Sequence, residues 1–476
     1  MDARTVLVLR VLTVSAFIVI LNETIIMNAL PVLMDALQID ARAGQWLSTG
    51  YMLTMAVIIP TTGWFLQRVG RRAAYITAIA SFATGTAIAA LAPGFEVLLV
   101  GRVVQAVGNA IMMPLLMSSV IALTPRHSRG RVMGYVSLAI SVAPAMGPTT
   151  SGLILAVASW RWLFGAVLPL AILIGVVGAV MLNPRGTTDA AAAGGRRRRV
   201  DPPSMLLSVI GFGGLVYGLS HLGDDTGPRL IGLPSAVVAL LVGVVGVAIF
   251  AWRQKSLVRR SEPLLDLRVF TIPAFALSVI VLAVARMSMM GTMILLPLYF
   301  QQARGMTALE AGLMLMPGGL AMGLLAPPIG RLYDRVGTAA LVVPGSIVLT
   351  LSLGAIAWST THGPWWLFLI LHVTMCLALA CIFTPVFSTG LGSLPSYLNE
   401  HGSASLSTVQ QVAGAAATAL VITVMSLRAE AVARTGVSEE QALGLGVEAA
   451  LAVGMMLSII AVVAAWFFTR PGLRHA

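Results

Sequence analysis

The sequence has few charged residues, and this scarcity excludes most soluble folds. Only 10% of its 476 residues are charged, while 58% are hydrophobic. In a soluble globular domain about 25% of the residues are charged. A chain of this composition needs a lipid bilayer to cover its apolar segments. We therefore expect an all-α integral membrane protein with many spans.

Other absences narrow the function. The two cysteines, Cys376 and Cys381, lie on different sides of one predicted helix, so neither a disulfide nor a metal site is expected. No segment matches the phosphate-binding pattern G-x-x-x-x-G-K-[ST], which argues against ATP as the energy source. No apolar run holds two acids, or an acid with a histidine, so the clustered side chains of an enzyme are missing.

The net charge of +12 arises from short basic clusters between the apolar runs. These clusters do not form a basic recognition face, so we expect no nucleic acid partner. They fall in loops of one parity, as at Arg68, Arg71 and Arg72, whereas loops of the other parity hold few basic residues. Because cytoplasmic loops are enriched in Lys and Arg, both termini are predicted to be cytoplasmic.

Apolar runs long enough to cross a bilayer, about 20 residues, recur along the chain. They lie at residues 8–32, 46–66, 74–92, 97–122, 133–157, 162–182, 204–222, 231–251, 273–300, 311–332, 339–358, 364–389, 404–427 and 447–468. Fourteen transmembrane helices are therefore predicted.

An internal repeat divides these runs into two related halves. The segment GWFLQRVGRR, which starts at Gly63, returns as GRLYDRVGTA, which starts at Gly330. Such repeats are typical of transporters built from two helix bundles. We expect an N-terminal six-helix bundle at 1–182 and a C-terminal one at 273–476. Between them we expect a cytoplasmic linker at 183–203, an inserted transmembrane helix pair at 204–252 and a second cytoplasmic linker at 253–272.

The first apolar run carries an acid, Glu23, near its middle. An ionisable group inside a membrane span costs at least ~2.5 kcal/mol, so such groups are rare and usually functional. One interpretation is that Glu23 lies close enough to the outer interface to contact water. The other is that it is a proton-binding site on a transport pathway.

The fourth run carries a polar stripe, because Arg102, Gln105 and Asn109 share one helical face. A polar stripe inside a span faces a cavity or other protein groups. Arg102 stays charged at any relevant pH, so it cannot carry a transported proton, but it can tune a nearby acid. A structural hydrogen bond between helices is the alternative.

These motifs resemble those of the fourteen-helix drug–proton antiporter branch of the major facilitator superfamily, and the resemblance covers nearly the whole chain. The first run, LNETIIMNALP at 21–31, is similar to the family pattern L-D-x-T-x-x-N-x-A-L-P, with Asn22 at the position of the family acid. The segment GRVVQAVGNA at 101–110 resembles R-x-x-Q-G-x-G-a-a. The resemblance implies two six-helix bundles with pseudo-two-fold symmetry plus an inserted pair, and proton coupling at Glu23 and Arg102.

The repeated loop segment resembles the superfamily motif G-x-L-a-D-r-x-G-r-k. The first copy matches it at Gly63, Arg68, Gly70, Arg71 and Arg72, with Gln67 where an acid is expected. The second copy matches it at Gly330, Asp334 and Arg335. A glycine-containing turn lets two helices approach, and the charged groups can pair or cap helix ends. We expect these motifs to latch one conformation shut; the alternative for the arginines is that they only set the topology.

The fifth run, SVAPAMGPTTSG, resembles the antiporter pattern g-x-x-x-G-P-x-x-G-G at Gly147, Pro148 and Gly152. Small residues at this spacing permit close helix contact, and a Gly-Pro pair favours a bend. The resemblance implies an exporter, whereas packing alone indicates only a helix contact.

The second half contributes the remaining candidates. Arg286 lies inside an apolar run, with Met290 and Met293 following at helical spacing; it pairs with Glu23, favours anionic or zwitterionic cargo, or has a structural role. His372 shares a helical face with apolar residues, so a buried histidine with satisfied hydrogen bonds is expected. Gln411 lies on a polar stripe that is expected to line the transport pathway. The full predicted substrate cavity is Asn22, Gln105, Asn109, Met113, Arg286, Met290, Met293, His372 and Gln411.

Together these features predict a proton-coupled antiporter that exports small amphipathic compounds by alternating access. A proton-coupled uptake symporter, or an exporter of a specific metabolite or lipid, is the alternative. We expect no cofactor and no metal, with the proton motive force as the energy source. The expected partners are a small-molecule substrate, protons and membrane lipids, for a monomer in a bacterial cytoplasmic (inner) membrane.

Overall fold

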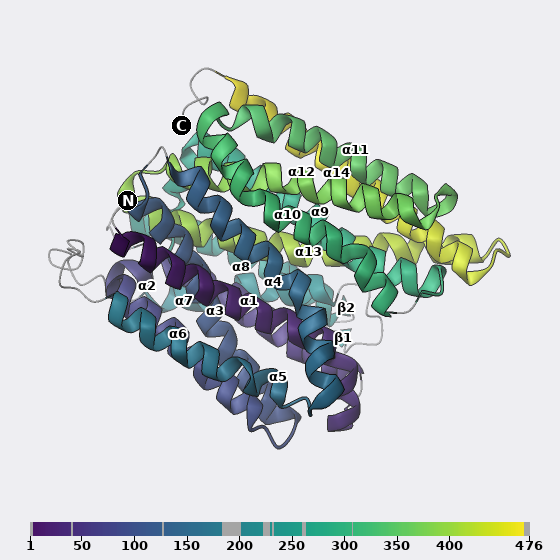
Figure 1. Ribbon diagram of the computed structural model, residues 1–476, viewed down its shortest axis with the longest axis horizontal. Coiled ribbons are helices and arrows are strands. Elements are labelled where there is room, and N and C mark those ends of the chain that lie inside the picture. The colour runs from purple at the N-terminus through teal and green to yellow at the C-terminus, as the bar shows by residue number, and fades with distance from the viewer. Residues whose placement is uncertain are drawn as a thin grey trace.

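The computed structural model describes residues 3–39, 41–125, 128–182, 201–221, 229–230, 233–258, 263–306 and 308–470. These residues form a bundle of long helices (Figure 1). Most of the predicted linker at 183–203, and part of that at 253–272, lie outside this set. The helical architecture expected from the apolar runs is confirmed.

The helices fall into three groups along the chain. The first group is α1 (Ala3–Leu37), α2 (Ala41–Ala90), α3 (Phe95–Leu123), α4 (Arg129–Val157), α5 (Trp162–Gly165) and α6 (Val167–Met181). The second is α7 (Pro202–Ser220) and α8 (Ser235–Val258), joined through the antiparallel strands β1 (Arg229–Leu230) and β2 (Leu233–Pro234). The third is α9 (Pro273–Leu298), α10 (Ala308–Val336), α11 (Ala339–His362), α12 (Trp365–Gly392), α13 (Asn399–Ala433) and α14 (Glu439–Trp466). Short turns η2 (Leu267–Thr271), η3 (Tyr299–Ala303), η4 (Ser396–Leu398) and η5 (Phe467–Thr469) complete the fold.

Twelve stretches within the described ranges are long and apolar enough to cross a membrane. One of them, Trp46–Ala90, contains the predicted run 46–66 and all but the last two residues of the run 74–92, on either side of a backbone break at Gly70. The run predicted at 133–157 forms α4, which is not among the twelve. A polytopic membrane protein is therefore confirmed, and the exact number of spans stays a prediction.

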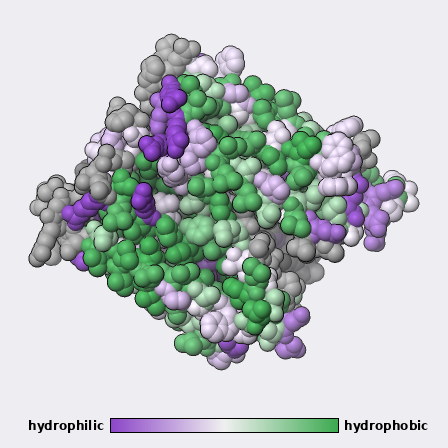
Figure 2. Space-filling view, in the orientation of Figure 1, coloured by the Kyte–Doolittle hydropathy of each residue, from purple (hydrophilic) through white to green (hydrophobic). Residues whose placement is uncertain are grey.

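The outer surface of the bundle is apolar. On α6 and α8 the exposed large side chains include Leu173, Val176, Leu241 and Val245, each more than half exposed. Figure 2 shows apolar residues over the middle of the visible face, with hydrophilic residues gathered toward its upper-left and right-hand ends. This distribution suits a protein whose middle is surrounded by lipid acyl chains.

The two copies of the repeated loop segment adopt matching backbone conformations. Gly70, the eighth residue of the first copy, has φ 75°, and Gly337, which occupies the same place in the second, has φ 79°. Residues with a side chain rarely adopt a positive φ, so a glycine is needed at each turn. Both copies lie at the end of the bundle where α1 begins and α14 ends (Figure 1). We call this the loop-motif end.

The helix pair α7–α8 packs through glycines and lies against both halves. A Cβ added at Gly211 or Gly218 would lie 2.8 Å from Val247 N or 2.6 Å from Leu240 N, so the two backbones touch. Ser208 Oγ donates to Val57 O of α2 at 3.1 Å, and Phe212 shares an apolar cluster with Ala404 and Ala415 of α13. The pair therefore bridges α2 of the first group and α13 of the third.

Asp201 ties α7 to α8 at the loop-motif end. Its carboxylate caps the first turn of α7 at Ser204 N and accepts two hydrogen bonds from Arg253, each 2.7 Å long. Arg253 holds the pKa of Asp201 at about 2, well below its ordinary value. On the same helix Gln254 donates to Ser204 Oγ and accepts from Leu264 N and Leu265 N. This network connects the pair to the segment that enters α9.

Candidate functional site

Glu23 lies inside the bundle on α1, and its carboxylate is bound from α3. Asn109 Nδ2 donates to Glu23 Oε2 at 3.1 Å and to Tyr51 Oη of α2 at 2.9 Å. The Glu23 side chain is partly buried, whereas Tyr51 and Asn109 are almost fully buried. One amide therefore links the acid to two other helices, and the acid remains accessible to a small ion or ligand.

Arg102 lies at the base of this group and is held from several sides. It is 1% exposed, and its guanidinium carbon lies 4.1 Å from the centroid of the Tyr51 ring. Nη1 donates to Gln105 Oε1 at 2.9 Å, and Gln105 Nε2 donates to Thr86 Oγ1 at 2.8 Å. The stripe Arg102–Gln105–Asn109 thus faces α1 and α2 inside the protein. Because Arg102 interacts with the charge of Glu23, it can stabilise the ionised acid.

Glycines bring α2 and α3 close enough for these contacts. A Cβ added at Gly85 or Gly108 would lie 2.5 Å from Gln105 N or from Ala78 O. Real side chains do not fit at such distances, so the two backbones pack directly against each other. This close approach places Thr86 and Tyr51 beside the stripe on α3.

Arg286 brings a second positive charge into the bundle from the opposite half. It lies on α9 and is close enough to Glu23 for their charges to interact, although no ion pair joins the two side chains. Its Nε is buried without a hydrogen-bond partner. A Cβ added at Gly414 of α13 would lie 3.8 Å from this Nε and 3.7 Å from Met290 Cγ. Of the roles open to Arg286, direct pairing with Glu23 is therefore not seen in this conformation.

The small-residue motif on α4 supports α1 next to the acid. A Cβ added at Gly147 would lie 2.7 Å from Thr24 Cβ, and Thr24 Oγ1 lies 3.5 Å from Ala143 O. Ser151, one turn further along α4, is fully buried. Gly152 is exposed, with no atom within 4 Å of an added Cβ. The side chain of Pro148 lies outside the described set, so the predicted bend stays a prediction.

The second loop motif joins the two halves by capping a helix. Asp334 of α10 accepts hydrogen bonds from Gly130 N at 2.8 Å and Arg131 N at 2.9 Å, the first amides of α4. Ser128, the N-cap residue of α4, makes no side-chain cap, so a carboxylate from the other half supplies it. Gly130 and Gly330 are in direct backbone contact at the same place. A carboxylate at a helix N-terminus is stabilised by the helix dipole.

The first loop motif makes the related contact between α2 and α13. A Cβ added at Gly63 would lie 2.8 Å from His401 Nδ1, and Gln67 Nε2 donates to Tyr397 O at 3.0 Å. Gln67 replaces the acid of the other copy, so it donates to a carbonyl where Asp334 accepts from amides. Both copies thus join the halves at the loop-motif end.

The arginines of the two motifs have different surroundings. Arg68 lies 5.3 Å from the Trp64 ring centroid, and Arg72 donates to Ala179 O at the end of α6. Arg71 has a buried Nε without a partner, and Arg335 is exposed.

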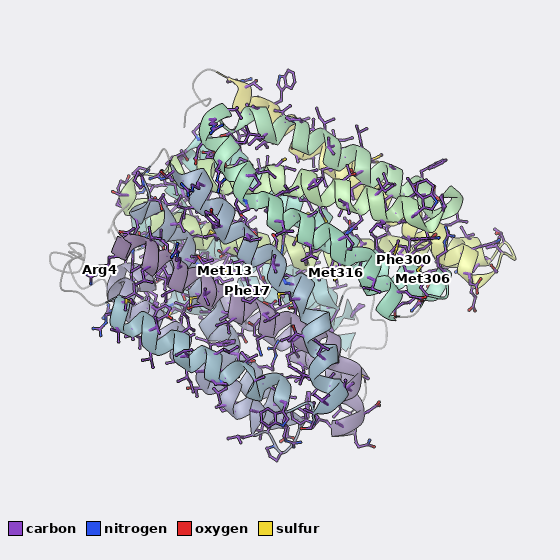
Figure 3. All side chains as sticks on the ribbon, viewed as in Figure 1. Arg4, Phe17, Met113, Phe300, Met306 and Met316 are labelled. Atoms are coloured by element: carbon purple, nitrogen blue, oxygen red, sulfur yellow. The ribbon has the colours of Figure 1, made fainter. Side chains whose placement is uncertain are left out.

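The other predicted cavity residues are spread over several helices. Asn22 is fully buried, and neither of its amide atoms has a hydrogen-bond partner. Met113, labelled with Phe17 in Figure 3, packs against the same core as that phenylalanine. Met293 is 43% exposed. Gln411 is partly exposed on α13, on the same face as Gly414.

His372 lies away from the acid, at the contact of α12 with α10. A Cβ added at Gly318 would lie 2.6 Å from its Cε1, and Cys376 Sγ lies 3.7 Å from its Nε2. Its Nδ1 is buried without a partner. Within the described ranges, no three His, Cys, Asp or Glu side chains gather as a metal site would require.

Sequence reasoning missed Tyr51 and Thr86 as members of the site, and it placed Thr24 in the first-run motif without predicting its contact with α4. A single hydroxyl in an apolar run carries no periodic signal, because Ser, Thr and Tyr occur throughout such helices. The nearest usable signal was the glycine pattern around Gly85 and Gly147, which indicates where two helices touch but not which partner is met.

A family model described as Major Facilitator Superfamily matches residues 12–418. The lincomycin resistance protein LmrB of Bacillus subtilis is 36% identical over 471 residues, covering 98% of this chain and 96% of that protein. A multidrug resistance protein B homolog of Mycobacterium tuberculosis is 28% identical over 379 residues, covering 79% of this chain and 68% of that protein. The human organic anion transporter MFSD10 has the same fold, with TM-score 0.67 and 14% identity over 98% of this chain and 100% of that chain.

Proposed function

Because the chain belongs to the Major Facilitator Superfamily, whose members are transporters and not enzymes, we propose that it is a proton-coupled antiporter that exports small amphipathic compounds. The proposal places it in the fourteen-helix drug–proton antiporter branch, in the cytoplasmic (inner) membrane of a bacterium. Both termini and the loop-motif end face the cytoplasm, and the protein works as a monomer. The proton motive force drives it without a cofactor.

The observation that carries this proposal is the position of Glu23. It is a carboxyl group inside the bundle, bonded by Asn109 and within electrostatic reach of Arg102 and Arg286. An acid inside a membrane span is costly and is usually retained because it has a function. Binding and releasing one proton in each transport cycle is such a function. Arg102 is held by Gln105 and Tyr51, so its charge remains beside the acid in both protonation states.

Alternating access requires that the halves separate at one end while they close at the other. In this conformation the halves are joined at the loop-motif end, through Asp334 with α4 and Gly63 with α13. The hydrogen bonds that Asp334 accepts are part of this contact, and such bonds can break and reform. We propose that their opening exposes Glu23 and the substrate to the cytoplasm.

The energy of one proton is enough for useful export. Moving one charge through ~100 mV supplies about 2.3 kcal/mol, and each ~1.4 kcal/mol corresponds to a tenfold concentration ratio. One exchanged proton therefore sustains a substrate gradient above about tenfold. The likeness of this chain, over 98% of its length, to the lincomycin resistance protein LmrB supports export of antibiotic-like compounds.

The direction of flux under an imposed pH gradient tests the proposal. Everted membrane vesicles from cells that lack their own drug pumps are made acidic inside, and lincomycin and cationic dyes are added outside. An antiporter accumulates substrate inside as protons leave. A symporter, the alternative, expels substrate under the same gradient, and a passive carrier only equilibrates it.

A further inference from the structure

The charges around Glu23 do not balance, because positive charge is in excess. The site holds one acid, Glu23, and two arginines, Arg102 and Arg286. Each buried charge inside a span is costly unless it is paired or used. One of the two arginines must therefore be accounted for by something other than Glu23.

Arg102 is satisfied by the protein itself. It is almost fully buried, it donates to Gln105 Oε1, and the face of Tyr51 lies 4.1 Å from its guanidinium carbon. A ligand has no free side from which to approach it. Arg102 is therefore the constant partner of Glu23 within the N-terminal half.

Arg286 differs in each of these respects. Its side chain is partly accessible, its Nε has no partner, and no hydrogen bond or ion pair of its guanidinium occurs among the residues that the structure describes. The neighbouring position on α13 is Gly414, which has no side chain to cover the guanidinium. A planar guanidinium with free donors is the group that binds a carboxylate or phosphate in two parallel hydrogen bonds.

We infer that the site takes amphipathic zwitterions, with the cationic group of the ligand beside Glu23 and its anionic group on Arg286. This inference rests on the proposed antiporter function. Glu23 belongs to α1 and Arg286 to α9, so one bound zwitterion contacts both halves of the protein. Both side chains are partly accessible, and no ion pair joins them directly.

A zwitterion is favoured over a simple anion because an antiporter exchanges its substrate for a proton. A ligand with only an anionic group binds best when Glu23 is neutral, so it binds together with a proton. Antiport requires the opposite, because the substrate must displace the proton. A cationic group displaces it by pairing with ionised Glu23, while the anionic group adds affinity at Arg286.

Three dyes with the same xanthene ring system test this assignment. Rhodamine B carries a delocalised cation and a free carboxylate, its ethyl ester carries only the cation, and fluorescein carries only negative charge. Binding is measured by fluorescence anisotropy on the purified full-length protein in detergent, in wild type, Arg286→Gln and Arg286→Lys. The matched control is Arg428→Gln, which changes an exposed arginine at the far end of α13.

Wild type should bind rhodamine B more tightly than its ester by about tenfold, the ratio expected for a charge-assisted hydrogen bond. Arg286→Gln should remove this preference without weakening binding of the ester, and Arg286→Lys should keep part of it. Fluorescein should bind weakly to wild type and more tightly to Glu23→Gln. Equal affinity of wild type for rhodamine B and its ester, or an equal loss of both in Arg286→Gln, would overturn the assignment.

The outcome is separable from that of the proposed function. If wild type pumps the ester in everted vesicles without preferring the carboxylate, the antiporter proposal stands and only the zwitterion assignment fails. If the carboxylate preference is present in binding but neither dye moves against a pH gradient, the antiporter proposal fails while the assignment of Arg286 stands.

Discussion

Asp334→Asn should loosen the contact between the halves at the loop-motif end. The carboxylate accepts from the amides of Gly130 and Arg131 at 2.8 and 2.9 Å. An asparagine keeps the shape but has one accepting oxygen and no charge. Leaving one of these two amides without an acceptor costs about 1–2 kcal/mol, which is about 5- to 30-fold in the equilibrium between joined and separated halves.

Hydrogen–deuterium exchange measures this equilibrium directly. The amides at residues 128–133 should exchange about 5- to 30-fold faster in Asp334→Asn than in wild type, in line with that free energy. A local loss of the cap would stop there. Separation of the halves as a unit should also speed exchange at residues 397–403, which contact Gly63 and Gln67 of the other motif copy.

The matched control is Arg335→Gln, which changes the exposed neighbour of Asp334 and should leave both segments as in wild type. Unchanged exchange at 128–133 in Asp334→Asn would refute the capping argument. Faster exchange at 128–133 with unchanged exchange at 397–403 would show a helix cap that does not hold the halves together.

Three further predictions test other parts of the argument. Glu23→Gln should still bind substrate but should neither drive uphill efflux nor release protons when substrate is added. Pumping by this variant with wild-type pH dependence would show that Glu23 does not carry the proton. Asn22→Asp is the control for the neighbouring family position. Gly147→Leu should abolish export because Thr24 Cβ lies 2.7 Å from the added Cβ. Gly152→Leu, with no atom within 4 Å of its added Cβ, should be inserted and active, and equal efflux from both variants would contradict the packing role. Asp201→Asn should lower the melting temperature in detergent at pH 7, since Arg253 depresses the pKa of Asp201 to about 2. A depressed pKa stabilises the fold above the ordinary value of 3.8, so the difference in melting temperature from wild type should be constant from pH 8 to about 5 and shrink as pH falls toward 2. A difference that vanishes near pH 6 would exclude this pair as its cause.

The sequence alone was enough to predict a helical membrane protein and its superfamily. Long apolar runs specify helices in a bilayer by length and hydropathy, without knowledge of their neighbours. The repeated loop segment predicted matching structure in both halves, and Gly70 and Gly337 have matching positive φ values. The cost of a charge in lipid also drew attention to Glu23 and Arg286 before any contact was known.

Helical periodicity correctly indicated that Arg102, Gln105 and Asn109 share a face, because their spacing is a local property of one helix. It did not indicate which helices that face meets. The partner of Glu23 is Asn109, 86 residues away, and the pairing depends on how α1 and α3 lie against each other. The same limit applies to Gly152, which belongs to the motif in sequence but lies away from the contact made by Gly147.

The joining of the two halves was decided only by tertiary structure. Asp334 is 204 residues from Gly130, and its carboxylate caps α4 because the repeat places α10 against that helix N-terminus. Arg286 of the C-terminal half likewise interacts with the charge of Glu23 in the N-terminal half. A sequence motif records which groups are present, whereas the balance of buried charge depends on distances between helices, which are set by packing of small residues across the whole bundle.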